Sequence, residues 1–324
     1  MMAWEMVLPD DAAKSRKDNV TSVQQLFKNE SVYETLEFSP SHLAALNMAD
    51  SEFEKQIKLN LASLNSQDAL YRTPLMWACA GGKQEKARML IEAGAVADVP
   101  DKHNKTALHW ATASKAIDIV KILLQYNAPL ESRDVFGRTP IWEAGRAPNS
   151  HQIIQLLVLH GADIESRDYI YERTPLLLAS YRGQSANVLS FLQFGADIES
   201  RMSTGRTPLL NAIAYNQFPT VEMLVKQGAQ ANVFDSDGRG ILHLAALFGS
   251  PKIMQALQQV DLTWVAVDRR DNEGRAAEEC FLQCRANFYT GRAKDDESDE
   301  DAFQELLRGT RKAQIKPTFS SSGF

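Results

Sequence analysis

The stretch "RTPLLLASYRG" at residues 173–183 returns as "RTPLLNAIAYN" at 206–216, 33 residues later. Related stretches occur at "RTPLMWACAGG" (72–82), "KTALHWATASK" (105–115), "RTPIWEAGRAP" (138–148) and "RGILHLAALFG" (239–249). We call the second residue of each stretch the cap position and number the repeats 1 to 6 by it: Thr73, Thr106, Thr139, Thr174, Thr207 and Gly240. The steps between cap positions are 33, 33, 35, 33 and 33 residues. A fixed period of this length is typical of stacked structural repeats.

Each repeat carries signals for two helices. Threonine is a good helix N-cap, and proline is favoured at the first helical position that follows it, as in Pro74, Pro140, Pro175 and Pro208. In repeat 2 the second helix shows apolar residues at helical spacing: Ile117, Val120, Leu123 and Leu124. A residue that tolerates the left-handed conformation then ends that helix: Gly94, Asn127, Gly161, Gly195 and Gly228. We predict helix, turn, helix and an extended arm such as "GADIESRD" (161–168), which returns as "GADIESRM" (195–202).

Helices this short are marginal alone in water, so the repeats must stack on one another. We predict a repeat array over 39–268, with six clear units from about 68 and a degenerate first unit at 39–67 that starts at Ser39. A degenerate capping unit around Ala276 occupies 269–290. Outside the array we expect a non-repeat helical cap at 1–38 and an acidic, partly disordered tail at 291–324.

The composition limits the class of protein. The formal net charge of −6 argues against a general nucleic-acid binder, which needs a basic surface to displace counterions. No run of about eighteen apolar residues is present, so no membrane-spanning helix is expected. The N-terminal "MMAWEMVLPDDAAK" is acidic where a secretory signal is apolar, and three cysteines are too few for a disulfide framework. We therefore expect a monomer of the cytoplasm and/or nucleus that contacts neither membrane nor nucleic acid directly.

The period and the signatures "RTPLLLASYRG", "GADIESRD" and "RGILHLAALFG" resemble ankyrin repeats. The segment "DNEGRAAEECFLQCRANF" (271–288) also resembles the closing segment of fungal ankyrin-repeat proteins. The resemblance implies an all-α ankyrin-repeat solenoid of stacked helix-turn-helix units with short hairpin-like loops. It further implies a non-catalytic scaffold that recognises a protein partner through its concave face and loop tips, with no cofactor.

No motif for catalysis or for metal binding stands out. His109 and His243 occupy the position where the ankyrin family has a buried histidine, and local hydrogen bonding is the role that this implies. Cys280 and Cys284 share a helix face, but no further ligand is near enough to complete a zinc site. We expect no catalytic residue, no cofactor and no metal site.

Three features indicate where a protein partner binds. The residue before every cap position is basic, which predicts a basic row and a partner with an acidic segment; pairing with loop carboxylates is the alternative. The ends of the first helices become aromatic and cationic in repeats 3 to 6, and Arg and Tyr are enriched in binding hot spots. The loop at 168–173 is one residue longer than its siblings and carries Tyr169, Ile170 and Tyr171. The predicted partner-binding residues are Phe136, Arg138, Arg146, Tyr169, Tyr171, Arg173, Tyr181, Arg182, Arg206, Tyr215, Arg239 and Phe248.

Two narrower functions remain open. One is a nuclear ankyrin-type transcriptional regulator, for example of a fungal biosynthetic gene cluster, and the other is a non-catalytic subunit of an enzyme complex. In the tail, Ser298 lies among acidic residues with Asp301 three positions on, a pattern that suits an acidophilic kinase. Ser298 is therefore a candidate phosphorylation site.

Overall fold

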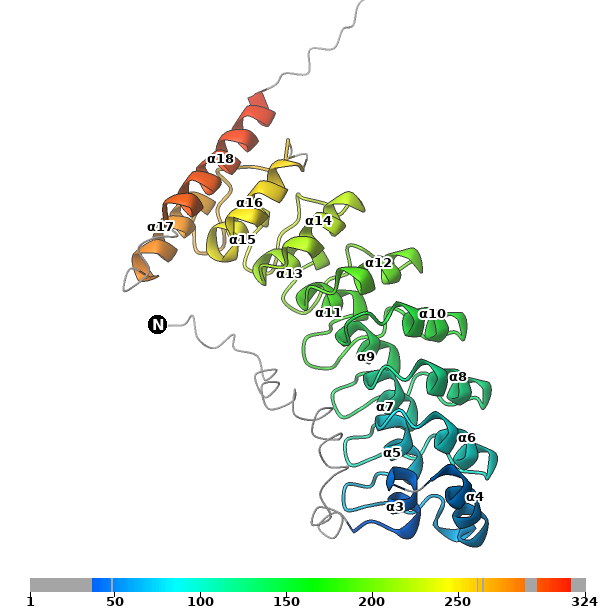
Figure 1. Ribbon diagram of the computed structural model, residues 1–324. Coiled ribbons are helices and arrows are strands. Elements are labelled where there is room, and N and C mark those ends of the chain that lie inside the picture. The colour runs from blue at the N-terminus through cyan, green and yellow to red at the C-terminus, as the bar shows by residue number, and fades with distance from the viewer. Residues whose placement is uncertain (1–36, 48, 261, 264, 289–295, 316–324) are drawn as a thin grey trace, which may run out of the picture. The chain divides into compact units, whose positions relative to one another are not determined.

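The computed structural model describes residues 37–47, 49–260, 262, 263, 265–288 and 296–315. This part of the chain forms helices joined by turns; it contains no strand, and a single isolated bridge pairs Arg270 with Ala276. The chain divides into two compact units on either side of the bond between Asp163 and Ile164. Within each unit the helices come in pairs (Figure 1). We call the first helix of a pair the inner helix and the second the outer helix. The helical cap predicted for 1–38 lies almost wholly outside the described residues.

The described residues of the first unit form four helix pairs. They are α3 (Pro40–Asn47) with α4 (Asp50–Leu59), α5 (Pro74–Ala80) with α6 (Gln84–Glu92), α7 (Ala107–Ala113) with α8 (Ile117–Gln125), and α9 (Pro140–Arg146) with α10 (His151–Leu159). A short 3-10 helix, η2 (Leu61–Ser63), follows α4. Inner helices pack on inner helices and outer helices on outer helices. The core therefore runs between successive pairs, with Leu75, Leu90, Leu108, Val120 and Ile154 fully buried.

In the second unit, the part that the structure describes forms four further pairs. They are α11 (Pro175–Tyr181) with α12 (Ser185–Gln193), α13 (Pro208–Ala214) with α14 (Phe218–Lys226), α15 (Ile241–Phe248) with α16 (Pro251–Gln258), and α17 (Ala277–Phe288) with α18 (Asp296–Ile315). The packing follows the same rule, since α13 lies between α11 and α15, and α16 lies between α14 and α18. Each pair contacts mainly its neighbours, as in stacked repeat proteins.

The inner helices begin where the sequence predicts. The hydroxyl oxygens of Thr73, Thr174 and Thr207 accept the N–H three residues on, at 3.3, 3.3 and 3.4 Å. Thr106 forms a reciprocal capping box with His109, and the Ser39 hydroxyl lies 2.7 Å from His42 Nδ1 in the same arrangement. Repeat 6 has no side-chain cap at Gly240, where an added Cβ would lie 2.9 Å from the Phe234 ring. The Phe234 ring thus occupies the space that a threonine side chain would need at Gly240.

The outer helices also end as predicted. The residues that follow them have positive φ angles of 98° at Gly94, 56° at Asn127 and 95° at Gly161. Gly195 and Gly228 show the same left-handed conformation. Glycine and asparagine adopt it with the least steric cost, which is why they recur at this position.

The "ESR" arms clamp one repeat to the next. Glu131, Glu165 and Glu199 accept the backbone N–H of Asp163, Asp197 and Gln230 in the following repeat, at 2.7–2.8 Å. Arg201 donates to Gly205 O of its own loop and to Phe234 O of the next repeat, both at 2.8 Å. Arg167 joins Glu172 O and Arg201 O in the same way. The sequence "GADIESR" occurs twice in this chain because its Glu and Arg side chains bind the backbone of the neighbouring repeat.

The end of the second unit carries a helix within the segment predicted as an acidic, partly disordered tail. Residues 296–315 form α18, which packs on α16 in the place of an outer helix. Its buried residues Ala302, Phe303, Leu306 and Leu307 recur at helical spacing, and the Phe303 ring stacks on Phe281 of α17 with centroids 4.5 Å apart. The segments predicted as a cap at 269–290 and a tail from 291 therefore contribute one helix each to a single closing pair.

Candidate functional site

An aspartate organises most of the hairpin loops. Its Oδ1 accepts the backbone N–H groups two and four residues on at 2.8–3.0 Å, in the loops that begin at Asp68, Asp101, Asp134, Asp235 and Asp271. The longer loop of repeat 4 uses Asp168 in the same way, whereas repeat 5 has Met202 at this position. Neighbouring loops are joined through the backbone, for example from Lys102 N to Leu70 O and from Ser203 N to Tyr171 O. The loops of each unit therefore form a hydrogen-bonded row.

Three of the predicted partner-binding arginines lie inside these loops. The exposed fractions of Arg138, Arg173 and Arg206 are 7%, 2% and 6%. Arg173 Nε donates to Asp168 Oδ2 at 2.9 Å, and Arg206 Nε donates to Asp235 Oδ2 at 3.2 Å. The predicted basic row therefore does not present these three side chains to solvent, because they are buried. Pairing with a loop carboxylate, the alternative left open by the sequence, describes Arg173 and Arg206.

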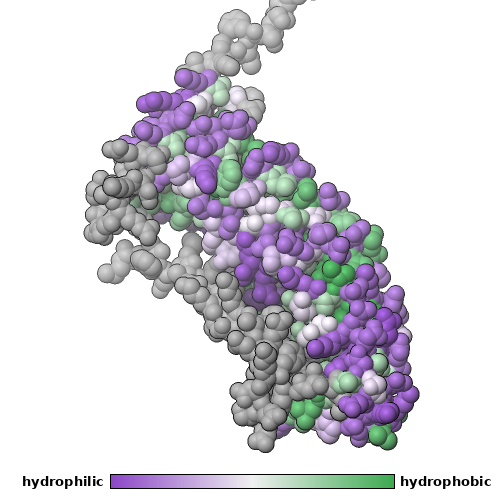
Figure 2. Space-filling model, viewed as in Figure 1, coloured by the Kyte–Doolittle hydropathy of each residue, from purple (hydrophilic) through white to green (hydrophobic). Residues whose placement is uncertain are grey.

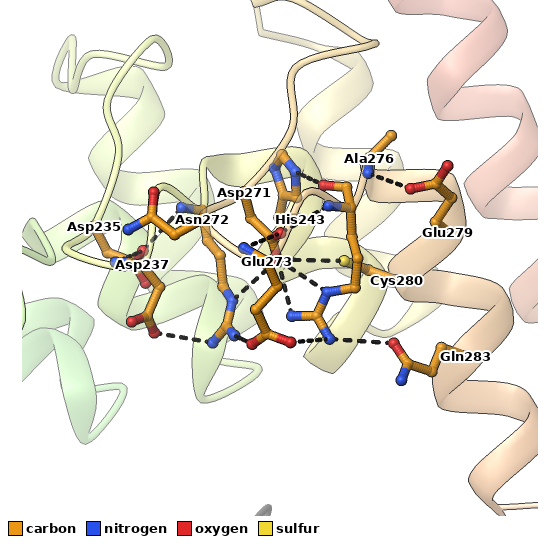
Figure 3. A network of polar contacts seen from close by, with 12 residues as sticks. Asp235, Asp237, His243, Asp271, Asn272, Glu273, Ala276, Glu279, Cys280 and Gln283 are labelled. Carbon is orange, nitrogen blue, oxygen red and sulfur yellow. Dashed lines mark hydrogen bonds and ion pairs between the residues drawn. The ribbon is translucent and has the colours of Figure 1, made fainter.

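Arg239 belongs to a polar network near the end of the second unit (Figure 3). It pairs with Asp237 at 3.1 Å and with Glu273 at 3.0 Å. Arg275 pairs with Asp271 and Glu273, both at 2.9 Å, and donates to Gln283 of α17 at 3.1 Å. Burial raises the pKa of Asp271, but the backbone N–H and guanidinium of Arg275 outweigh that effect and lower it. This network ties the loop of repeat 6 to the closing helix pair.

Four predicted residues of the second unit meet in one cluster. The Arg173 guanidinium carbon lies 4.8 Å from the Tyr171 ring centroid and 5.9 Å from that of Tyr181. The Tyr181 ring meets the Tyr215 ring edge to face, with centroids 4.3 Å apart. We call Tyr171, Arg173, Tyr181 and Tyr215 the aromatic cluster; its three tyrosines are half-buried. The cluster joins the loop of repeat 4 to the ends of α11 and α13.

Exposed apolar side chains accompany the aromatic cluster in the second unit. The Tyr169 side chain, two residues before Tyr171, is 66% exposed, and Ile170 is 42% exposed. Phe248, at the end of α15, is 47% exposed. Arg182 is half-buried beside Tyr181 in the sequence. On the face drawn in Figure 2, hydrophobic residues form separate spots in a largely hydrophilic surface.

The remaining predicted residues lie in the first unit. The Arg138 guanidinium carbon lies 4.6 Å from the Phe136 ring centroid and 4.5 Å from that of Trp142. Arg146 Nε donates to Glu143 at 2.7 Å, and Lys105 Nζ lies 2.6 Å from the same carboxylate, which is 1% exposed. Burial raises the pKa of Glu143, but Lys105 and Arg146 outweigh it and hold that pKa well below its usual range. Arg146 is thus bound to an internal carboxylate and is half-buried.

One cluster in the first unit was missed by the sequence interpretation. The Arg72 guanidinium carbon lies 5.0 Å from the Trp77 ring centroid and 4.9 Å from that of Trp110. The two indole N–H groups donate to Asp68 Oδ2 and Asp101 Oδ2, at 2.9 and 3.0 Å. We call Arg72, Trp77 and Trp110 the Trp–Arg stack. Its sequence signal is a tryptophan four residues after the cap position in both repeats.

The histidines serve the fold. His109 Nε2 lies 3.0 Å from Arg138 O and His243 Nε2 lies 3.1 Å from Arg275 O, so each ring bridges to the next repeat. Burial lowers the pKa of both rings. In the part of the chain that the structure describes, no three His, Cys, Asp or Glu side chains are grouped to hold a metal ion. No helix there is both long and apolar enough to cross a membrane. The side chain of Ser298 lies outside the described residues.

Comparison with known proteins gives one family. The family model described as ankyrin repeats (three copies) matches residues 12–134 and 176–263. Human B-cell lymphoma 3 protein is 31% identical over 174 residues, which are 52% of this chain and 38% of that protein. Human ankyrin repeat and SOCS box protein 16 is 31% identical over 192 residues, 57% of this chain and 42% of that protein. A human transient receptor potential channel, subfamily A member 1, is 28% identical over 200 residues, 60% of this chain and 18% of the channel. The chain thus spans less than half the length of these relatives.

Two solved structures share the fold. The ankyrin repeat domain of Bcl-3 aligns with a TM-score of 0.60 and 27% identity, over 68% of this chain and 98% of that domain. The human ASB11 ankyrin repeat domain aligns with a TM-score of 0.62 over 72% of this chain and 98% of that chain; at 22% identity this likeness concerns the fold alone.

Proposed function

The chain belongs to the ankyrin repeat family, and on that premise we propose that it is a non-catalytic scaffold that binds a protein partner. The binding surface consists of the inner-helix ends and loop tips. The longer relatives include a channel of which only 18% aligns with this chain. The functions of the other segments of these relatives are therefore not assigned to this chain. Protein recognition is what ankyrin repeats generally provide.

The aromatic cluster is the observation that supports this surface. It carries three half-buried tyrosines across two adjacent repeats, with Tyr169 and Phe248 exposed in the same unit. Arg173 is fixed by Asp168, so Tyr171 and Tyr181 are held in place before any partner arrives. Rigid aromatic side chains bind with little loss of conformational entropy, and tyrosine is enriched in hot spots.

The test is affinity capture with the full chain, followed by mass spectrometry and by variants of this surface. We expect Tyr169→Ala together with Phe248→Ala to weaken binding of the captured partner by about 30-fold, or about 2 kcal/mol. Tyr169 is 66% exposed and Phe248 is 47% exposed, so the melting temperature should fall only slightly. Tyr126→Ala is the matched control, because Tyr126 is 51% exposed but follows the outer helix α8.

Loss of binding in the Tyr126 control, or full binding by the double variant, would contradict the proposed surface. Tyr171→Ala is a less clean variant, since it removes a ring that packs on the buried Arg173. A partner acted on chemically by the purified chain alone would contradict the non-catalytic assignment.

The narrower functions are distinguished by location and by co-purification. A nuclear transcriptional regulator requires nuclear enrichment in cell fractionation, and an enzyme subunit requires an enzyme that co-purifies in fixed stoichiometry. The three relatives named above are human proteins, so they neither support nor contradict a resemblance to fungal ankyrin-repeat proteins. An acidic segment in the partner remains part of the proposal, but the buried Arg138, Arg173 and Arg206 are not its binding site.

A further inference from the structure

Arg72, the cation of the Trp–Arg stack, lies near the carboxylates of Asp68 and Asp101; burial lowers its pKa, while these carboxylates raise it. In the described part of the chain no acidic side chain forms an ion pair with Arg72, and its buried Nε–H meets no acceptor there. Three equivalent residues form ion pairs: Lys105 with Glu143, Arg173 with Asp168, and Arg239 with Asp237 and Glu273. Arg138 resembles Arg72, because its guanidinium lies against the Phe136 and Trp142 rings and its buried Nε–H also meets no acceptor in the described chain. Arg72 therefore carries the same charge as Lys105, Arg173 and Arg239 but lacks their ion pairs.

The reason lies in the two tryptophans. In the loop of repeat 4 the second carboxylate oxygen of Asp168 accepts from the arginine of the same loop. In repeat 1 the corresponding oxygen of Asp68 accepts from Trp77 Nε1 instead, and its other oxygen accepts two backbone N–H groups. Asp101 is occupied in the same manner by Trp110 and by its own loop. Both nearby carboxylates are therefore already bound by other donors.

The geometry of the stack keeps the guanidinium ready for an anion. Two indole rings near the planar group, at 5.0 and 4.9 Å, hold it by cation–π contact. Such contacts use the ring faces and leave the terminal N–H donors of the guanidinium edge for hydrogen bonds, although the Nε–H is buried. Arg72 and Trp110 are half-buried, so few water molecules contact the guanidinium. A carboxylate that binds there displaces little water and gains a charge-assisted hydrogen bond.

We propose that Arg72, held between Trp77 and Trp110, is the anchor for a carboxylate side chain in an acidic segment of the protein partner. This inference rests on the proposed function and assigns the acidic segment to the first unit. Arg72 acts as a forked donor, Trp110 borders the contact, and Lys105 is engaged with Glu143 and contributes no free charge. The occupant is a carboxylate of another protein; an acidic residue from segment 1–36 of the same chain is the competing occupant.

The experiment selects short random peptides displayed on phage against the full-length chain. We expect enrichment of peptides that contain Asp or Glu. For an enriched peptide, Arg72→Gln should raise the dissociation constant at least about tenfold, and replacing the acidic residue by its amide should do the same. Because both changes remove one interaction, the double change should cost no more than either alone.

Two further variants keep the test decisive. Arg88→Gln removes a cation of the same unit that lies on α6 beside Glu85, so it controls for a general charge effect and should leave binding unchanged. Arg72→Lys keeps the charge but lacks the planar fork, and we expect its affinity to lie between those of wild type and Arg72→Gln. Both Arg72 variants weaken the contact with the two indole rings, so their melting temperatures should fall somewhat, and peptide binding is compared at a temperature where all variants are folded.

Equal peptide binding by wild type and Arg72→Gln overturns the inference, as does enrichment without acidic residues. Tighter binding by Arg72→Gln also overturns it, since that result identifies segment 1–36 as the occupant of Arg72 in the free chain. The proposed function fails separately: if the captured partner is unaffected by the Tyr169 and Phe248 changes as well as by Arg72→Gln, the whole surface assignment falls. If only Arg72→Gln is without effect, the anchor alone falls.

Discussion

At the scale of single residues, the second oxygen of the loop aspartate in repeats 1, 2 and 4 binds either an indole N–H or the arginine of the same loop. Where the residue four after the cap position is Leu178, Asp168 binds Arg173 and the arginine is buried. Where that residue is tryptophan, the indole N–H donates to the second oxygen of the aspartate, and the cation of the loop does not bind that oxygen. Lys105 finds Glu143, a carboxylate that occupies the tryptophan position of the next repeat. A buried carboxylate between two cations is costly to leave unpaired, so Glu143 should dominate the acid sensitivity of the first unit.

The free energy of unfolding should depend on pH through Glu143. Its pKa in the folded chain lies well below the ordinary value of 4.5, so its stabilising effect is complete above pH 4.5 and is lost as the pH falls through the folded pKa. We expect Glu143→Gln to lower the unfolding free energy by about 3 kcal/mol at pH 7. That difference from wild type should shrink as the pH is lowered below 4.5. Urea unfolding across this pH range measures it.

The exposed Glu85 supplies the control. Glu85→Gln removes a carboxylate that lies 3.8 Å from Arg88 on the surface, and its effect should be small at every pH. A difference between wild type and Glu143→Gln that stays constant down to pH 3 would show that burial, and not ionisation, governs the effect.

At the scale of elements, the arms couple one repeat to the next through side-chain bonds to backbone groups. A helix pair of this size is marginal alone, so its stability depends on such contacts with neighbours. Arg201 is exposed yet joins two repeats, whereas the exposed Lys226 binds Glu222 of its own helix. Position within the repeat, rather than burial, therefore determines the structural role of Arg201.

Arg201→Ala should uncouple the loops of repeats 5 and 6. Removing the bonds to Gly205 O and Phe234 O should lower the unfolding free energy by about 1 kcal/mol and speed amide exchange over 202–206 and 233–239. Hydrogen exchange with mass spectrometry resolves these segments. Lys226→Ala, which breaks a pair inside α14, should leave exchange in the neighbouring loops unchanged. The same exchange profile for both variants would refute a special role for the arm.

At the scale of the whole chain, each of the two units is a row of similar pairs, and the second ends on a pair with an unusually long outer helix. α18 has 20 residues, compared with 9 in α14, and its apolar face covers α16. A terminal repeat must cover the apolar side of its neighbour while presenting polar residues outward. The acidic start of α18 suits this role, because acidic residues are favourable near a helix N-terminus.

Truncation after Thr290 should destabilise the second unit. The deletion removes Phe303, Leu306 and Leu307 and exposes the side chains that they cover, including Phe281. We expect a lower melting temperature and a tendency to aggregate, measured by calorimetry and light scattering. Truncation after Ile315 keeps α18 and should melt as the full chain does. If truncation after Thr290 left the melting curve unchanged, α18 would contribute nothing to the stack.

The parts of the fold that depend on local signals could be predicted from the sequence. Thr174 with Pro175 starts a helix and Gly195 ends one wherever the rest of the chain lies. α18 could not be predicted so easily, since the acidic run before Ala302 is typical of solvated chain, and only packing on α16 favours the helix. In the candidate site, Tyr181 and Tyr215 were predicted, but the burial of Arg173 was not. The bond between Arg173 and Asp168 requires that the second oxygen of that carboxylate is not already bound, as Trp77 binds the corresponding oxygen of Asp68 in repeat 1.

The clamps between repeats also have a mechanical consequence. A chain pulled from its ends loads the bonds of Glu199 and Arg201 to the next repeat, and these can break one repeat at a time. Each release frees about 33 residues, or roughly 110 Å of extended chain. In a single-molecule force trace the chain should therefore lengthen in steps of nearly equal size. Arg201→Ala should lower the force of one step and leave its length the same.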